Sequence, residues 1–378
     1  MRHLATIRKI KELRPIPNAD RIEVAIIDGW ECIVNKADGF KVGDLVVYVE
    51  IDSVLPDRPE FEFMRKYKFR VKTIKLRGQV SQGLVLPLSI IPSTDNDPTA
   101  EYTEIMRIEE GLDVTNILGI KKYDPEAARE KVWWQKLAVQ NKVVFPWWLK
   151  PFKRIKFIRN WWINKHKTVD DFPDFIKKTD EERIQNMPNL FDQIKNGEIP
   201  LTVTEKMDGT SATYFLKDGK FGVCSRNKWI LKDDGSPYWQ VANKYDVEQL
   251  LRSLAGFGSK HSLYVLQGEI VGKSIQGNKY HLSGFMFLPF NLIIDGKRLK
   301  YNDMKEYLEF CSLNPVPLLE KELVIPKPWE IADLVNYAKG VSKYRDGIEP
   351  REGIVCRNEH HHISFKVINP DFLLKEED

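Results

Sequence analysis

The chain has 378 residues, of which 42% are hydrophobic and 30% are charged, and its formal net charge is +4 at pH 7. A chain of this length is expected to form two or more domains, and its composition excludes an intrinsically disordered protein. The small positive charge does not by itself indicate nucleic-acid binding.

The sequence contains no run of about 18 apolar residues, and its first residues lack the apolar core of a secretory signal. We therefore expect an intracellular protein without a transmembrane segment. The four cysteines form no C-x-x-C pair, which excludes a disulfide framework or a zinc ribbon and predicts reduced thiols; they are Cys32, Cys224, Cys311 and Cys356.

Short strands separated by turns are expected from the N-terminus to about residue 87. They span residues 4–10, 21–27, 30–34, 44–50, 69–76 and 84–86, a spacing that is typical of a small β-barrel. The segment 15–23, with Gly29-Trp30 and residues 42–44, resembles the tRNA-binding type of OB module. The sequence therefore predicts an OB-type domain with a C-terminal extension at residues 1–119.

Residues 120–168 form a basic, tryptophan-rich segment that we interpret as an insertion or linker. Three tryptophan pairs begin at Trp133, Trp147 and Trp161, and no acidic residue lies between positions 142 and 167. Basic side chains interleaved with aromatic ones suit contact with a nucleic acid or a membrane interface. A protein partner, or a strut between domains with buried tryptophans, stays open as an alternative.

Residues 179–182 match a capping box, with Thr179 as N-cap and Glu182 at the third helical position. The pattern predicts a helix that passes Arg183 and ends before Gly197. From position 201 onward, strand patterns mix with helical stretches. This pattern predicts an α+β domain with packed antiparallel sheets and flanking helices at residues 169–378.

The pattern Lys-x-Asp-Gly occurs three times, beginning at Lys36, Lys206 and Lys232. Because Lys, Asp and Gly are common in turns, the pattern alone identifies no site. Lys36 falls between two expected strands, where a hairpin turn explains it, and Lys232 precedes Ser-Pro, which indicates another turn. Lys206 instead follows a β-branched strand pattern at 201–205.

Groups that suit nucleotide chemistry follow Lys206 in order: Arg226, Glu269, Phe290, Glu352 and the strand lysine Lys366. An amine attacks phosphorus only when it is neutral, and prearranged cations stabilise the charge that develops on the phosphate. We expect Lys366 and a bound metal to lower the pKa of Lys206. The order resembles motifs I, Ia, III, IIIa, IV and V of the covalent lysine nucleotidyltransferases, which include polynucleotide ligases and mRNA capping enzymes.

The resemblance implies which of these residues would bind or react with the phosphates of ATP and RNA. Lys206 would carry AMP as a phosphoramidate, and Lys366 would contact the α-phosphate. Arg183 is a further candidate for contact with the triphosphate or with an RNA phosphate. Ile368 stands where motif V often has a second lysine, and Lys375 is a candidate for the missing cation.

The resemblance also implies contacts with the base, the ribose and a metal. Glu205 would lie beside the base, Phe290 would stack on adenine, and Arg226 with Glu269 would hold the ribose. Carboxylate oxygens suit Mg²⁺ or Mn²⁺, directly or through water, and the candidate ligands are Asp208, Glu269 and Glu352. The run at 360–362, three histidines, is expected to be a surface turn rather than a metal site.

The whole arrangement resembles the ATP-dependent RNA ligases with an N-terminal OB module. DNA ligases and capping enzymes usually carry an OB domain after motif V, whereas here twelve residues follow Lys366. The resemblance implies sealing of 3′-OH and 5′-phosphate RNA ends or nicks through lysyl-AMP and adenylylated RNA. A DNA ligase, a GTP-using capping-type enzyme and a catalytically dead RNA-binding protein are the alternatives. The sequence leaves the natural RNA and the oligomeric state open.

Overall fold

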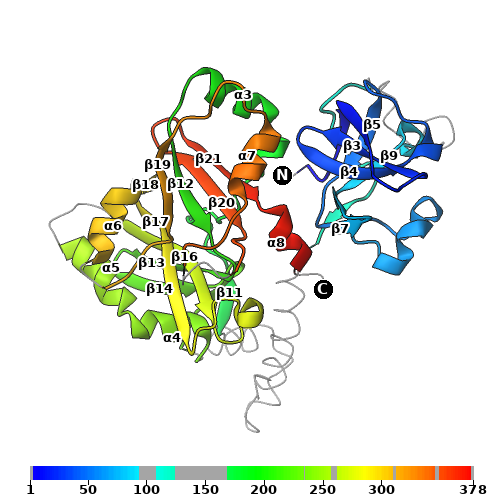
Figure 1. Cartoon of the computed structure of the whole chain (residues 1–378). Helices are drawn as coiled ribbons and strands as arrows, with labels where there is room; N and C mark the ends of the chain where they lie inside the picture. The colour runs from blue at the N-terminus through cyan, green and yellow to red at the C-terminus, as the bar shows by residue number, and fades with distance from the viewer. Residues whose placement is uncertain are drawn as a thin grey trace, which may run out of the picture.

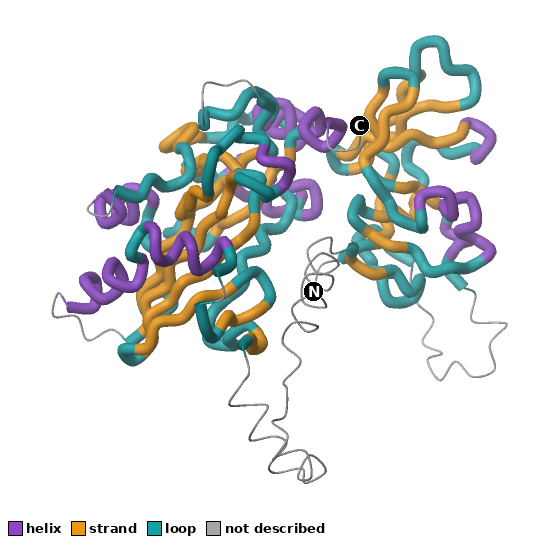
Figure 2. The backbone as a smooth tube through the Cα atoms, turned by 90° about the horizontal axis from the view of Figure 1, so that it is seen from below, coloured by secondary structure: helices purple, strands orange, loops and turns teal. Residues whose placement is uncertain are grey.

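The computed structural model describes residues 3–92, 108–123, 168–233, 235–256, 262–309, 312–344 and 349–375. These residues form two lobes, an N-terminal β lobe and a larger C-terminal α+β lobe (Figures 1 and 2). The tryptophan pairs lie outside the described residues, so their interpretation stays a prediction. Within the described ranges, no helix is long and apolar enough to cross a membrane.

The N-terminal lobe consists of short antiparallel strands around two hydrophobic clusters. Ile7 and Val47 are buried in one cluster, and Trp30 and Tyr48 stack in the other. The described strands pair in four small sheets, in the orders β1-β5-β9, β2-β3-β4, β10-β6 and β7-β8, and not in one closed barrel. The strands are β1 (Ala5–Lys9), β2 (Glu12–Pro15), β3 (Ile22–Ile27), β4 (Trp30–Asn35), β5 (Leu45–Val49), β6 (Ser53–Val54), β7 (Thr73–Leu76), β8 (Gln79–Gln82), β9 (Leu84–Leu86) and β10 (Lys121–Lys122).

Two local predictions for this lobe were wrong. The expected strand at 69–76 is shorter, because a 3-10 segment, η2 (Pro59–Tyr67), precedes it and its C-cap Lys68 has a positive φ. The turn at Lys36 is a 3-10 turn, η1 (Lys36–Asp38), and not a hairpin. The strands on either side of it, β4 and β5, belong to different sheets.

The C-terminal lobe contains two antiparallel sheets. One has the order β11-β15-β14-β13-β16-β17-β18 and the other β19-β12-β20-β21. The strands are β11 (Val169–Asp171), β12 (Leu201–Lys206), β13 (Thr210–Lys217), β14 (Lys220–Cys224), β15 (Lys228–Ile230), β16 (Leu263–Gly272), β17 (Phe285–Ile294), β18 (Lys297–Arg298), β19 (Leu318–Leu323), β20 (Gly353–Asn358) and β21 (Ile363–Ile368).

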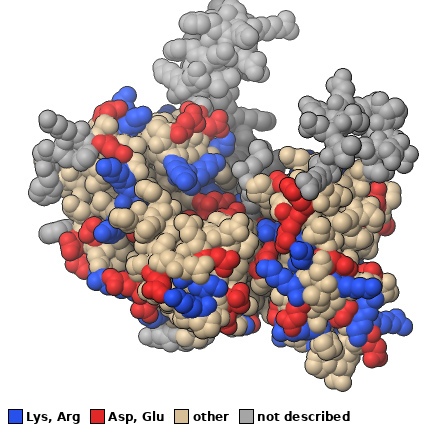
Figure 3. Space-filling model, turned by 90° about the horizontal axis from the view of Figure 1, so that it is seen from above, with Lys and Arg blue, Asp and Glu red and all other residues tan. Residues whose placement is uncertain are grey.

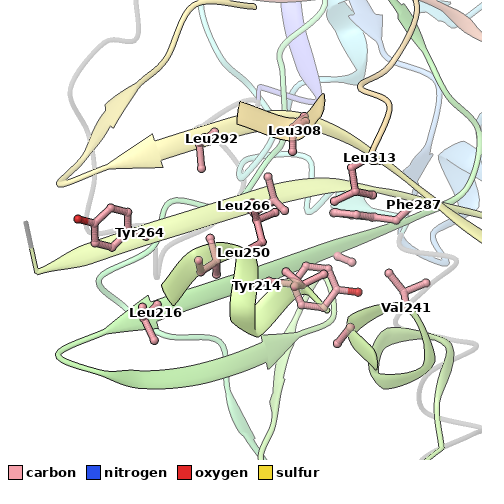
Figure 4. Packing of buried hydrophobic residues seen from close by; sticks show 14 of the residues in the cluster. Tyr214, Leu216, Val241, Leu250, Tyr264, Leu266, Phe287, Leu292, Leu308 and Leu313 are labelled. Atoms are coloured by element: carbon pink, nitrogen blue, oxygen red, sulfur yellow. The ribbon is translucent and has the colours of Figure 1, made fainter. Parts of the chain in front are cut away.

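Helices cover one face of each sheet. The helices α4 (Pro237–Lys244), α5 (Val247–Gly256) and α6 (Tyr301–Glu309) pack on the larger sheet. There Tyr214, Leu266 and Phe287 from three adjacent strands meet Leu250 and Leu308 from the helices (Figure 4). The helices α3 (Pro188–Asn196) and α7 (Ile331–Ala338) cover the smaller sheet. The opposite face of each sheet is not covered by these helices.

The helix expected from the capping box at 179–182 starts later than predicted. Residues 179–182 are not helical; η6 (Ile184–Asn186) follows them, and α3 begins at Pro188 and ends at Asn196, before Gly197 as expected. The Glu182 carboxylate accepts hydrogen bonds from Arg183 N and Asn186 Nδ2. The Glu182 carbonyl accepts from Lys366 N, so tertiary pairing with β21 replaces the helical bonds.

The two lobes contact each other directly. Gly29 has a positive φ, and a Cβ there would lie 2.9 Å from Ile331 of α7. The C-terminal helix α8 (Pro370–Lys375) lies between the lobes (Figure 1), and Leu373 packs against the N-terminal cluster. Strand β10 pairs with β6, so the chain stays with the N-terminal lobe as far as residue 122.

Candidate active site

Strand register places Lys206 at the end of β12, beside the start of β20. Lys206 pairs with Gly353, and Thr204 pairs with Val355, which in turn pairs with Lys366. Because side chains alternate along a strand, Lys206 and Lys366 project from the same face of the smaller sheet. This is the face opposite the one that α3 and α7 cover.

Three carboxylates act on the Lys206 amine. Lys206 Nζ lies 2.6 Å from Glu352 Oε1, and both side chains are largely buried. Glu269 lies on β16, and its Cγ would be 2.8 Å from a Cβ at Gly209. Burial alone would lower the pKa of Lys206, but Glu352, Glu269 and Asp208 raise it above its ordinary value of 10.5.

The expected lowering of the Lys206 pKa depends on a bound metal together with Lys366 and stays a prediction; the described carboxylates alone raise this pKa. The carboxylates hold the Lys206 amine in its charged form, while Lys366 Nζ lies 3.4 Å from Asp180 Oδ1. A charged amine cannot attack phosphorus, so adenylation requires a change in the charges around it.

The residues after Lys206 form a tight turn into β13. The N–H of Asp208 donates to the hydroxyl of Tyr280, and Lys279 Nζ lies 2.8 Å from Asp208 Oδ2. A Cβ at Gly209 would lie 2.3 Å from the carbonyl oxygen of Ile270 on β16. Glycine is required here because β13 and β16 approach closely.

The other two Lys-x-Asp-Gly matches use their glycine differently. Gly39 and Gly235 have φ near +70°, and the space around an added Cβ is open among the described atoms. Their glycines permit a left-handed turn, and Gly235 N donates to Asp233 Oδ1 within that turn. Both matches are turns, as expected, and only Gly209 is constrained by another strand.

Asp180 connects two of the expected nucleotide-binding cations. Lys366 Nζ lies 3.4 Å from Asp180 Oδ1, and Arg226 Nη2 lies 3.8 Å from Asp180 Oδ2. Lys122 of the N-terminal lobe is closer still, with its Nζ 2.7 Å from Oδ2. Burial would raise the pKa of Asp180, but Lys366, Lys122 and Arg226 hold it well below its usual range.

Glu205 and Lys206 project from opposite faces of β12. The buried Glu205 carboxylate accepts hydrogen bonds from Ser342 Oγ at 2.5 Å and Lys343 N at 2.8 Å. Burial raises the pKa of Glu205 despite these bonds. Its two described donors thus tie the end of β12 to the chain after α7.

Phe290 lies where the two sheets meet. It packs beside the cluster that contains Met207 and Tyr280. Arg357 Nη1 donates to the Phe290 carbonyl, and the guanidinium carbon lies 5.7 Å from the centre of its ring. Arg357 is buried and also pairs with Glu181, at 3.0 Å. The hydrogen bond from Arg357 to the Phe290 carbonyl thus connects β20 with β17 next to the expected base-binding ring.

Arg183 contacts the N-terminal lobe. Its guanidinium carbon lies 5.5 Å from the centre of the Trp30 ring, and its Nη2 lies 3.8 Å from Asp52 Oδ2. The side chain is 4% exposed. Its backbone forms a parallel bridge with Lys366, so Arg183 connects β21 with the N-terminal lobe.

A divalent cation fits beside Lys206 if a substrate contributes ligands. Glu352 Oε2 is buried and has no hydrogen-bond partner among the described atoms, and Asp208 and Glu269 lie near the same amine. The described residues contain no group of three or more His, Cys, Asp or Glu that forms a complete metal site. Mg²⁺ ordinarily keeps several waters and binds substrate phosphates together with one or two carboxylates.

The histidine run at 360–362 lies in the turn between β20 and β21, as expected. Four residues that contribute to the site were missed: Asp180, Lys279, Tyr280 and Arg357. Lys279, Tyr280 and Arg357 belong to no motif that was recognised in the sequence. The one available signal for Asp180 was that it lies three residues before Arg183, a candidate phosphate contact. The sequence analysis assigned Asp180 instead to the capping box at 179–182.

Comparisons with known proteins agree with this arrangement. A family model described as an OB-fold domain matches residues 4–88, and one described as RNA ligase matches residues 199–368. A comparison with curated protein sequences finds no match.

Among solved structures, the chain is similar to the Naegleria gruberi RNA ligase. A variant with ATP and Mn is 29% identical with a TM-score of 0.76, and the complex with pyrophosphate is 29% identical with a TM-score of 0.75. A variant with AMP and Mn is also 29% identical, with a TM-score of 0.75. In all three, 100% of both chains is covered.

The two family models and the match to the Naegleria enzyme over the whole chain define a polynucleotide ligase with an N-terminal OB-fold domain and an α+β ligase domain. The chain belongs to the ATP-dependent RNA ligases with this domain order. The expected fold class and family are confirmed.

Proposed function

We propose that this RNA ligase joins a 3′-OH and a 5′-phosphate RNA end through AMP bound to Lys206, and that nicked duplexes are among its substrates. The observation that carries this assignment is the placement of Lys206. Its amine lies at the end of β12, among Glu352, Glu269 and Asp208, and on the same sheet face as Lys366.

The proposed first step requires a neutral Lys206. A proton leaves Nζ, for which Glu352 Oε1 at 2.6 Å is the nearest described acceptor. The nitrogen lone pair then forms a bond to the α-phosphorus of ATP, and the bond to the departing pyrophosphate oxygen breaks. Gly353, the pairing partner of Lys206, also pairs with Ile368 of β21, and Lys366 lies two residues before Ile368. Lys366 contributes positive charge for the α-phosphate.

Two further transfers complete the reaction. An oxygen of the RNA 5′-phosphate attacks the same phosphorus, and the phosphorus–nitrogen bond breaks to return Lys206. The 3′-OH then attacks the 5′-phosphate, a phosphodiester forms, and AMP leaves. Arg226 and Glu269 are proposed to hold the ribose, Phe290 to stack on adenine, and Glu205 to shape the pocket beside the base.

The spacing of residues replaced in the Naegleria structures supports these roles. A lysine and an aspartate two positions apart were replaced there, as far apart as Lys206 and Asp208. A glutamate and a lysine fourteen positions apart were also replaced, which is the spacing of Glu352 and Lys366. Arg183 stays a lower-ranked proposal for a phosphate contact, since its described contacts are with Asp52 and Trp30.

We propose Mg²⁺ or Mn²⁺ as the metal, held by Glu352 with Asp208 and Glu269. The buried Oε2 of Glu352 is suited to this role, and structures of the Naegleria enzyme contain Mn. A bound divalent cation supplies positive charge that offsets the carboxylates and favours loss of the Lys206 proton.

The proposed domains are the OB-fold domain with its extension at 1–119, the tryptophan-rich segment at 120–168 and the ligase domain at 169–378. The pairing of β10 with β6 suggests that the extension continues to about residue 122. We propose an intracellular site of action, since the described cysteines Cys32, Cys224 and Cys356 are free, buried thiols.

One assay tests the proposed function. The chain is incubated with α-labelled ATP or GTP and Mg²⁺ or Mn²⁺, and is then chased with nicked duplexes whose 3′-OH strand is RNA or DNA. The proposal predicts label on the protein from ATP and transfer to nicks with an RNA 3′-OH. Labelling by GTP alone would indicate a capping-type enzyme, and equal sealing of DNA 3′-OH strands would indicate a general polynucleotide ligase.

A further inference from the structure

Asp180 occupies a position among cations where a phosphate oxygen would be stable. Its two carboxylate oxygens face Lys366, Arg226 and Lys122, with separations of 3.4, 3.8 and 2.7 Å. Carboxylate and phosphate oxygens bind the same ammonium and guanidinium groups. Two of these cations, Lys366 and Arg226, are the ones that the proposed function assigns to the nucleotide.

The three cations come from different parts of the fold. Lys366 lies on β21, Arg226 follows β14, and Lys122 lies on β10, which pairs with β6 of the N-terminal lobe. Asp180 itself lies in the extended segment before η6. One carboxylate thus joins both sheets of the ligase domain to the N-terminal lobe.

We propose that Asp180 competes with the nucleotide for Lys366, which the proposed function assigns to the α-phosphate, and for Arg226, which it assigns to the ribose, and that Lys122 sets the strength of this competition. The inference rests on the proposed function, because it takes these two cations as nucleotide ligands. An anion that arrives at Lys366 repels a carboxylate that stays there. Asp180 can then remain with Lys122, its closest cation, and release the other two.

This model predicts opposite effects for the two partners. Removing the Asp180 charge takes one competing anion away from Lys366 and Arg226, so the nucleotide binds more tightly. Removing Lys122 leaves Asp180 dependent on Lys366 and Arg226, so phosphate binds more weakly. A residue that only maintained the fold would weaken binding in both cases.

The test measures binding of ATP with Mg²⁺ by isothermal titration, in a full-length Lys206→Ala background that cannot consume ATP. Asp180→Asn is expected to tighten binding about fivefold, the size of one partly exposed ion pair. Asp180→Glu is the matched control that keeps the charge, and it should change the affinity less than about twofold. Circular dichroism checks that each variant is folded.

A double-mutant cycle tests the role of Lys122. Lys122→Ala should weaken ATP binding about threefold when Asp180 is present, and should have no effect in the Asp180→Asn variant. Equal weakening in both backgrounds would show that Lys122 itself contacts the nucleotide, and would overturn the model.

Unchanged or weaker ATP binding by folded Asp180→Asn would also overturn the inference. That result leaves the proposed function standing if the protein with Lys206 intact still forms lysyl-AMP. Failure of that protein to become labelled would instead contradict the proposed function.

Discussion

Lys206 Nζ lies 2.6 Å from Glu352 Oε1, although 146 positions separate the two residues in the chain. Antiparallel pairing of β12 with β20 produces the contact, because Lys206 pairs with Gly353, the residue after Glu352. The Glu352 carboxylate consequently favours the charged form of the Lys206 amine.

Glu352→Gln should therefore raise the chemical reactivity of the Lys206 amine and at the same time lower the rate of lysyl-AMP formation. Loss of the carboxylate charge lowers the pKa of Lys206, so a small acylating reagent should modify Lys206 about tenfold faster at pH 8. Formation of lysyl-AMP should fall on the order of a hundredfold, because a proposed metal ligand is lost. Peptide mass spectrometry measures the first quantity and labelled ATP the second.

Glu306→Gln, at an exposed position on α6, is the matched control and should change neither rate. A Glu352→Gln variant in which Lys206 becomes less reactive toward the reagent would contradict the assigned charge state.

Gly209→Ala should destabilise the protein more than Gly39→Ala. At Gly209 a Cβ meets the Ile270 carbonyl oxygen at 2.3 Å, so the backbone of β13 or β16 must shift, at a cost of about 3 kcal/mol. At Gly39 the alanine meets open space and only the left-handed φ is unfavourable, at a cost of about 1 kcal/mol. Urea unfolding measures both, and equal losses would refute the distinction between the two glycines.

Arg183→Ala and Asp52→Ala together test whether Arg183 stabilises the contact between the two lobes rather than binding a phosphate. We expect their effects on the free energy of unfolding to be coupled by about 1 kcal/mol, since the pair is only partly exposed. Neither change should then alter the KM for ATP more than about twofold, a shift of under half a kcal/mol. A large increase in KM for Arg183→Ala alone would favour direct phosphate contact.

Glu181→Gln should destabilise the protein in a pH-dependent way. Burial raises the pKa of Glu181, but Arg357 and Arg298 lower it below its ordinary value of 4.5. A lowered carboxyl pKa stabilises the fold above the unfolded-state pKa, and this stabilisation disappears as the pH falls through the folded-state pKa.

Glu181→Gln should thus cost on the order of 3 kcal/mol at pH 7, because it leaves the buried Arg357 without its charged partner. The difference from the unmodified protein should shrink below about pH 4. Thermal unfolding at pH 3.5, 5 and 7 measures it, and a difference that grows toward low pH would contradict the assigned pairing.

The sequence predicted the parts of the site that depend on local pattern and order. Lys206 was distinguished from Lys36 and Lys232 by the strand before it and the groups after it, and its role stays a proposal. Of the glycines in the three Lys-x-Asp-Gly matches, only Gly209 packs against another strand. The antiparallel sheets and the turn at 360–362 were also expected from alternation and turn chemistry.

The parts that were missed depend on contacts between distant segments. Residues 179–182 have the letters of a capping box, yet pairing with β21 draws Glu182 into a strand-like bond with Lys366. Asp180 then becomes an ion-pair partner rather than a helix residue. A sequence pattern could not predict the roles of Lys279 and Arg357 either, because their partners Asp208 and Glu181 lie 71 and 176 positions away.

Charge on the surface gives little further guidance, since Lys, Arg, Asp and Glu side chains are interspersed on both lobes in Figure 3. The ion pairs of Asp180 carry more information than the net charge of +4. They join the expected cations Lys366 and Arg226 to one carboxylate, Asp180.

The most direct measurement of the central claim is the position of the covalent AMP. The protein is incubated with ATP and Mg²⁺, digested, and examined by peptide mass spectrometry, with Lys206→Ala, Lys36→Ala and Lys232→Ala in parallel. The proposed mechanism predicts AMP on Lys206 alone, lost in Lys206→Ala and retained in the other two variants. AMP on another residue, or equal labelling of all three variants, would contradict it.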